Sequence, residues 1–157
     1  MALWSDLVEV YKHEKKSLIR AVPKWSDEHF ELKRGKKMKV SLACQVVSHS
    51  AAAGIRFYVQ QGEMEERALE TADFCEKVNL LWDFINSNTL DAPPSKRAIS
   101  MKKYYEDMAR LAAFQEFVCS WQFIAPNGKP RSLPSHMGWK MALSSIKQLS
   151  GELFILT

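Results

Sequence analysis

The stretch FCEKVNLLWDFINS, residues 74–87, is the segment around which we expect this chain to fold. Its apolar residues recur at four, three and four positions, the stripe of an amphipathic helix with one face against a core. That stripe consists of Phe74, Val78, Leu81 and Ile85. At about 100° per residue, Trp82 falls at the edge of the stripe, Asn86 a little beyond it, and Asp83 nearly opposite its centre. An aromatic ring, an amide and a carboxylate on one flank of a packed helix are suited to holding a flat polar ring.

Further helical patterns lie on both sides of this stretch. We expect helices over residues 5–20, 26–32, 38–61, 71–87 and 100–122, and a last one beginning at residue 135. Pro23 ends the first, Gly62 ends the third, and Thr71 caps the central helix. In the last helix the residues expected to face inward are Met141, Ala142, Ile146 and Leu149. Because alternating strand and helix patterns are absent, we predict an all-α fold, a single bundle of about five to six helices with a short extended C-terminal tail, ELFILT.

Length and composition point to one domain over residues 1–157. A chain of 157 residues with 46% hydrophobic content is long enough to bury a sizeable core. No run approaches the roughly 20 apolar residues of a membrane span, and the first residues lack the order of a signal peptide. We therefore expect a soluble, intracellular protein with no membrane contact. The three widely spaced cysteines, Cys44, Cys75 and Cys119, lie in apolar helical patterns and are expected to be core residues.

The positive charge of the chain is concentrated in residues 33–39, KRGKKMK. The net charge of +4 and the isoelectric point near 9.0 are mild, but they favour a polyanionic partner. This segment leads directly into the helix expected from Met38, so its lysines and the free N–H groups of that helix would converge on one electropositive spot. The segment is either a solvated loop or a phosphate-binding site.

Common catalytic motifs are absent from the sequence. It contains no phosphate-binding GxxxxGK[ST] loop, no GxGxxG, no GxSxG, no HExxH and no CxxC. The four histidines, His13, His29, His49 and His136, show no metal-ligand spacing. Cys44 and His49 lie five residues apart, a helical spacing that turns them away from one another. We therefore predict no catalytic residue and no metal ligand in this chain.

Two blocks in order, KMKVSLACQVVSHSAAAGIRFY (residues 37–58) and TADFCEKVNLLWDFINSNTL (residues 71–90), resemble the insertion domain of P-element-type transposases. This family includes proteins that carry an N-terminal THAP zinc domain. The first block is similar to the family pattern KMxVxLAxQxxSxSVAxxI and the second to TxxFxxxxNxLFDxxNS. PKWSDEHF, residues 23–30, and ALSSIKQLSGELFILT, residues 142–157, extend the resemblance over nearly the whole chain.

The resemblance implies a function in binding GTP. The family's insertion domain binds GTP as a cofactor, without hydrolysing it, for assembly of the transposase on DNA, and we expect Mg²⁺ to accompany the phosphates. The residues that match family nucleotide contacts are Lys24, Val40, Ser48, Trp82, Asp83 and Asn86, with Lys39 as a second phosphate lysine. A carboxylate at Asp83 would accept both N1–H and N2–H of guanine, a pair that adenine lacks. Trp82 would pack on the ring, the two lysines would meet phosphates, and Ser48 and Asn86 would bond base or ribose.

The resemblance also implies a larger parent protein. The family's domain is inserted into an RNase H-like catalytic core, whose first two metal-binding acids would precede Met1 and whose third would follow Thr157. We therefore expect that this chain alone neither cuts nor joins DNA. Transposon-end DNA and the RNase H-like core would be its partners in the parent, which is expected to oligomerise only at full length and to lie in the nucleus.

Two other functions stay open from the sequence. One is a domesticated or degenerate helical module that contacts DNA or protein through its basic face without a nucleotide. The other is a free-standing hydrolase, for which the sequence offers only isolated histidines and carboxylates. Guanine preference that depends on Asp83 distinguishes a GTP-binding module from both.

Overall fold

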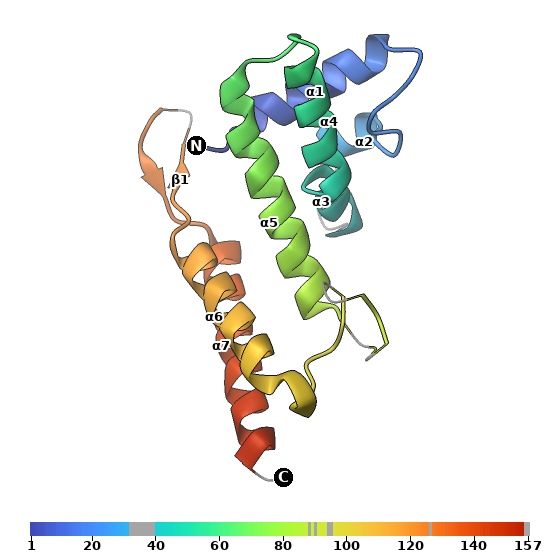
Figure 1. Cartoon of the computed structure of the whole chain (residues 1–157). Helices are drawn as coiled ribbons and strands as arrows, with labels where there is room; N and C mark the ends of the chain where they lie inside the picture. The colour runs from blue at the N-terminus through green and yellow to red at the C-terminus, as the bar shows by residue number, and fades with distance from the viewer. Residues whose placement is uncertain (32–39, 88, 90, 94–95, 126, 156–157) are drawn as a thin grey trace. The chain divides into compact units, whose positions relative to one another are not determined.

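The computed structural model describes residues 1–31, 40–87, 89, 91–93, 96–125 and 127–155, and it is dominated by helices (Figure 1). The α-helices are α1 (Trp4–Lys16), α2 (Asp27–Phe30), α3 (Val40–Val46), α4 (His49–Gln60), α5 (Leu69–Ile85), α6 (Tyr104–Cys119) and α7 (Pro134–Ile155). Short 3-10 turns, η2 (Glu66–Ala68) and η3 (Met101–Lys103), precede α5 and α6. The short strands β1 (Phe123–Ile124) and β2 (Pro130–Arg131) pair antiparallel. The prediction of an all-α fold is confirmed.

The chain divides into two compact units, which we name the N-terminal unit (Met1–Asn86) and the C-terminal unit (Ser87–Thr157). Each is described by itself. The single domain over residues 1–157 stays a prediction. Within the described residues, no helix is both long enough and apolar enough to span a membrane.

The core of the N-terminal unit lies where α1, α4 and α5 pack together (Figure 1). α4 and α5 run antiparallel, because His49 at the start of α4 contacts Asn79 late in α5, and Arg56 further along α4 contacts Asp73 early in α5. Small residues on both long helices allow their close packing. The core consists of Leu7, Val10, Tyr11, Val22, Trp25, Val46, Ala51, Ala52, Ile55, Tyr58, Met64, Ala68, Ala72 and Cys75.

α1 ends at Lys16, so the prediction that this helix runs to about residue 20 is wrong. The reason is a buried carboxylate. Glu14 turns inward and accepts hydrogen bonds from the backbone N–H groups of Ala21, at 2.8 Å, and Val22, at 3.0 Å. These bonds hold the chain in a turn after the helix. The two aliphatic residues expected on its inner face are therefore exposed: Leu18 and Ile19.

The helix predicted over residues 38–61 is two helices, α3 and α4, separated at Val47 and Ser48. Ser48 is extended, with φ −131° and ψ 167°, and its side chain accepts a hydrogen bond from the backbone N–H of Ala51. A serine in this conformation is an N-cap, which begins a new helix. The predicted end at Gly62 is confirmed, since this glycine has φ 74°, a conformation that glycine adopts without strain.

α5 begins at Leu69, so Thr71 is not its cap. Thr71 lies inside the helix, buried, and its hydroxyl donates to the carboxylate of Asp6 at 2.5 Å. Asp6 also pairs with Arg67 at 2.9 Å. This network ties the start of α5 to α1. The buried face of α5 differs from the predicted stripe. The buried apolar residues of α5 are Ala72, Cys75, Leu81 and Phe84, whereas Phe74, Val78 and Ile85 are only half-buried.

In the C-terminal unit α6 and α7 lie side by side (Figure 1), with Leu111, Val118 and Leu143 fully buried. The predicted inner face of α7 is wrong, because Met141 and Leu149 are exposed. The apolar residues of α7 are distributed around much of the helix, so its sequence is compatible with more than one buried face.

The extended tail predicted over residues 152–157 is wrong up to residue 155, and residues 156–157 lie outside the described part of the chain. Instead of an extended tail, α7 continues to Ile155, and its helical hydrogen bonds satisfy the backbone without a partner strand. Cys119, expected in the core, is exposed at the end of α6. Cys75 is buried as predicted, and Cys44 is half-buried.

Candidate functional site

The break between α3 and α4 places a helix N-terminus at the centre of the candidate site. Ser48 accepts from the N–H of Ala51 at 3.2 Å, and its hydroxyl donates to the carbonyl oxygen of Gln45 at 2.9 Å. The hydroxyl therefore joins the last turn of α3 to the first turn of α4. Ser48 is a structural cap, and any nucleotide contact would use its remaining acceptor capacity.

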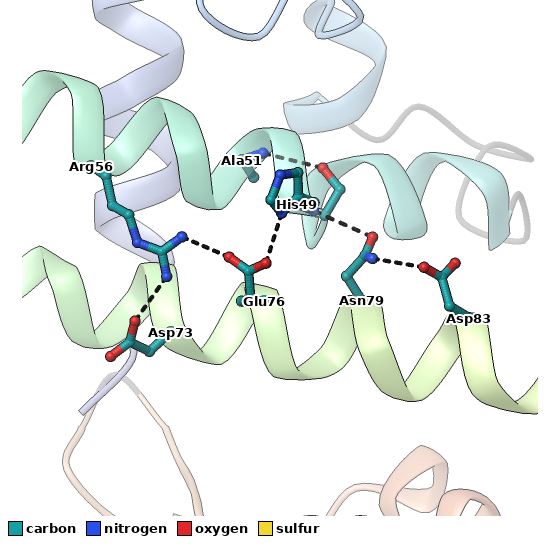
Figure 2. Close-up of polar contacts among 8 residues, drawn as sticks. His49, Ala51, Arg56, Asp73, Glu76, Asn79 and Asp83 are labelled. Carbon is teal, nitrogen blue, oxygen red and sulfur yellow. Dashed lines mark hydrogen bonds and ion pairs between the residues drawn. The ribbon is translucent and has the colours of Figure 1, made fainter. Parts of the chain in front are cut away.

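A polar chain runs from this N-terminus to Asp83 on α5 (Figure 2). The backbone N–H of His49 donates to Oδ1 of Asn79 at 3.3 Å. The Nδ2 amide of Asn79 then donates to Oδ2 of Asp83 at 3.2 Å, one helical turn along α5. Asp83 is half-buried, so its carboxylate lies between solvent and the packed face of the helix.

Ion pairs join the same two helices next to this polar chain (Figure 2). Arg56 on α4 contacts Glu76 at 2.6 Å and Asp73 at 2.9 Å, and the side chain of His49 contacts Glu76 at 2.7 Å. The hydrogen bond from Arg56 lowers the pKa of Glu76, and His49 acts in the same direction against the opposing effect of burial. Glu76 is therefore ionised at neutral pH and holds α4 to α5.

Lys24 is connected to the same region through its neighbour in sequence. Trp25 is buried, and its indole N–H donates to the carbonyl oxygen of Gln45 at 2.9 Å. Ser48 donates to that same carbonyl. The exposed Lys24 thus extends from backbone that is anchored beside the cap of α4.

The other predicted site residues that the structure describes lie on α5, on its C-cap and at the start of α3. Trp82 is half-buried beside Asp83, and Asn86 is exposed at the C-cap of α5, where its amide donates to the carbonyl oxygen of Trp82 at 2.8 Å. Val40 is 58% exposed at the start of α3. Lys39, with the whole basic segment 33–39, lies outside the described residues.

Sequence reasoning missed Asn79 and assigned no role to His49. Asn79 could have been found from its spacing, since an Asn four residues before an Asp lies on the same helix face. The contribution of His49 is a backbone N–H, made available because the helix starts there. No side-chain pattern could have signalled it.

The arrangement offers the chemistry for recognising a planar polar group that carries N–H donors. A half-buried carboxylate accepts two such donors in parallel. Among the residues that the structure describes, no three His, Cys, Asp or Glu side chains are grouped so as to hold a metal ion.

The structure is a helical module whose candidate site lies at the start of α4 and on the second half of α5. Comparison with family models identifies the family: residues 1–98 match the TNP-like, GTP-binding insertion domain. Because the match covers more than half of the 157 residues, the chain belongs to this family of transposase-like insertion domains. A search of curated proteins finds no match, and a search of solved structures finds none.

Proposed function

We propose that this protein binds GTP through the hydrogen-bonded residues that run from the N-terminus of α4 to Asp83 on α5. The observation that carries the proposal is the hydrogen-bonded chain from the N–H of His49 through Asn79 to Asp83, within the residues matched by the family model. Asp83 would accept N1–H and N2–H of guanine. Adenine has no hydrogen on N1 and no 2-amino group, so the same carboxylate would disfavour ATP.

The remaining site residues would hold the rest of the nucleotide. Trp82 would pack against the purine, and Asn86 and Ser48 would bond the base or the ribose. The two lysines, Lys24 and Lys39, would neutralise phosphate charge. Mg²⁺ would accompany the phosphates, because in nucleotide sites this ion is held largely by phosphate oxygens and water. Val40 would provide an apolar contact.

In the parent protein, GTP would act as an assembly cofactor and would not be hydrolysed. The proposed parent is a P-element-type transposase, of the class that includes THAP-domain proteins, acting in the nucleus. The concentration of basic residues in segment 33–39 of the sequence supports a role in contacting transposon-end DNA. Cleavage and joining would belong to the RNase H-like core, and this chain would contribute no catalytic residue.

Replacing Asp83 by Asn tests the base-recognition step. Asparagine offers one acceptor and one N–H₂ donor, which complements xanthine, with its N1–H donor and its C2 carbonyl acceptor. We expect Asp83→Asn to weaken GTP binding at least about tenfold and to improve XTP binding relative to wild type. Calorimetric titration with GTP, XTP and ATP measures both changes.

One result would contradict the role proposed for Asp83. If Asp83→Asn binds GTP as wild type does, Asp83 does not read the base and the proposed orientation of the nucleotide is wrong. Thermal unfolding of the variant, followed by circular dichroism, shows whether any loss comes from misfolding.

A further inference from the structure

The side chain of Asn79 is fixed at both ends by groups from two different helices. Its Oδ1 accepts the backbone N–H of His49 on α4, and its Nδ2 donates to Asp83 on α5 (Figure 2). A backbone N–H can only donate, so it determines which end of the amide faces α4. The N–H₂ end is consequently directed at the carboxylate of Asp83.

We propose that Asn79 is a positioning residue for guanine selection. It holds the carboxylate of Asp83 in a fixed position relative to the N-terminus of α4. This inference rests on the proposed GTP-binding function. Holding Oδ2 through the Asn79 amide restricts rotation of the carboxylate, and a carboxylate has acceptor capacity for two N–H groups of a base besides this bond. Asn79 itself need not touch the nucleotide.

Asn79 needs an amide to satisfy both neighbours. Asn79 accepts from the N–H of His49 and donates to the Asp83 carboxylate, so one short side chain acts as acceptor and donor at once. Leucine fills a similar space with neither group. Aspartate keeps the acceptor for His49 but places a second negative charge beside Asp83, which disfavours the arrangement at neutral pH.

A different explanation is that Asn79 simply holds α4 against α5. The ion pair between Arg56 and Asp73, at 2.9 Å, supplies a matched control for this, because it also joins the two helices but lies toward the start of α5. Asp73→Asn removes the negative charge from an ion pair between the two helices without altering the hydrogen bonds from His49 to Asp83.

The experiment measures GTP and ITP binding to the whole chain by calorimetry for wild type, Asn79→Leu and Asp73→Asn. ITP lacks the 2-amino group of guanine, so the ratio of GTP to ITP affinity reports how well Asp83 accepts both base donors. We expect Asn79→Leu to lower GTP affinity about tenfold and to bring the GTP/ITP ratio close to one. Asp73→Asn should keep both affinities within about twofold of wild type.

A second variant provides a signature that helix packing would not produce. In Asn79→Asp, protonation of one carboxyl restores an O–H donor between residues 79 and 83, so GTP binding should recover as the pH falls from 7.5 toward about 5. Wild type should show no such recovery, because protonating Asp83 removes an acceptor for the base. The ionisable side chains beside these residues, His49, Glu76 and Arg56, are common to both proteins. This pH profile also remains informative if Asn79→Leu fails to fold.

The outcomes separate this inference from the function on which it rests. If wild type binds GTP selectively while Asn79→Leu and Asn79→Asp keep the wild-type GTP/ITP ratio, Asn79 has no positioning role and only the inference is overturned. It is overturned as well if Asp73→Asn reduces the ratio as much as Asn79→Leu does. If wild type binds neither nucleotide, the proposed function fails, and the inference fails with it.

Discussion

Among individual residues, a buried carboxylate organises the turn that follows α1. Glu14 is 1% exposed and accepts hydrogen bonds from the N–H groups of Ala21 and Val22 and from the hydroxyl of Tyr58 at 2.9 Å. A buried acidic side chain is tolerated when hydrogen bonds surround it in this way. The turn leads into the segment that carries Lys24, so Glu14 supports the site indirectly.

Because of Tyr58, the free energy of unfolding should depend on pH in the alkaline range. Burial, reinforced by the hydrogen bond to Glu14, raises the pKa of Tyr58 from 10.0 to about 12. The unfolded chain therefore releases this proton at lower pH than the folded chain. The stabilisation is complete below pH 10 and is lost as the pH rises through about 12, with a maximum loss of about 3 kcal/mol.

Denaturant unfolding at several pH values between 8 and 12 measures this effect. The difference in the free energy of unfolding between wild type and Tyr58→Phe should shrink steadily above pH 10. Other titrating groups are common to both proteins and cancel in the comparison. A constant difference over that range would show that the Tyr58 proton is not retained on folding.

Part of the candidate site could be predicted from residue spacing. The position of Trp82, Asp83 and Asn86 on a flank of the central helix follows from helical geometry alone, and the structure places them on the second half of α5 and its C-cap. The link through Asn79 to the N–H of His49 could not be predicted, because it depends on a helix start created by the break at Ser48.

At the level of the helices, Gly54 allows α4 to pack closely against Val22 and Val10. A Cβ at Gly54 would lie 2.6 Å from Cγ2 of Val22, a residue that is 1% exposed, and 3.6 Å from Cγ1 of Val10. Both neighbours belong to the core. The absence of a side chain here is required by packing, although glycine itself lowers helix propensity.

Two glycine substitutions should therefore have opposite effects. Gly54→Ala should destabilise the protein by about 1–3 kcal/mol because the new methyl group overpacks against Val22. Gly138→Ala, within α7, meets nothing within 4 Å and should stabilise its helix by about 0.5–1 kcal/mol. Thermal unfolding followed by circular dichroism tests the pair. Stabilisation by Gly54→Ala would mean that α4 does not approach Val22 as closely as described.

Helix content could be predicted from apolar periodicity, whereas several helix ends could not. α1 ends early because Glu14 bonds to backbone after the helix, and Thr71 is internal because its hydroxyl bonds to Asp6, 65 residues away in sequence. Both causes are tertiary contacts of polar side chains. A local apolar pattern carries no information about them. The inner face of α7 was predicted wrongly for a different reason, because apolar residues lie on more than one side of that helix.

At the scale of the whole chain, the N-terminal unit and the residues matched by the family model both contain the described residues of the candidate site. The N-terminal unit, Met1–Asn86, lies entirely within the matched residues 1–98. Its core and every described residue of the candidate site lie in that unit. The GTP-binding function should therefore reside in the first 98 residues.

A fragment of residues 1–98 should fold and bind GTP with an affinity comparable to that of the whole chain. Circular dichroism and a cooperative thermal transition would establish folding, and titration with GTP would establish binding. A fragment that folds but binds far more weakly would show that the C-terminal unit contributes to the site. An unfolded fragment would show that the N-terminal unit depends on the rest of the chain.

Guanine-nucleotide binding by this chain can be measured by calorimetric titration of the purified 157-residue protein with GTP and Mg²⁺, with ATP as the control. We expect saturable binding of GTP, at least about tenfold tighter than ATP, with the nucleotide recovered unhydrolysed. Equal binding of both nucleotides would contradict guanine selection by Asp83. No binding of either would contradict the nucleotide-binding function of this chain.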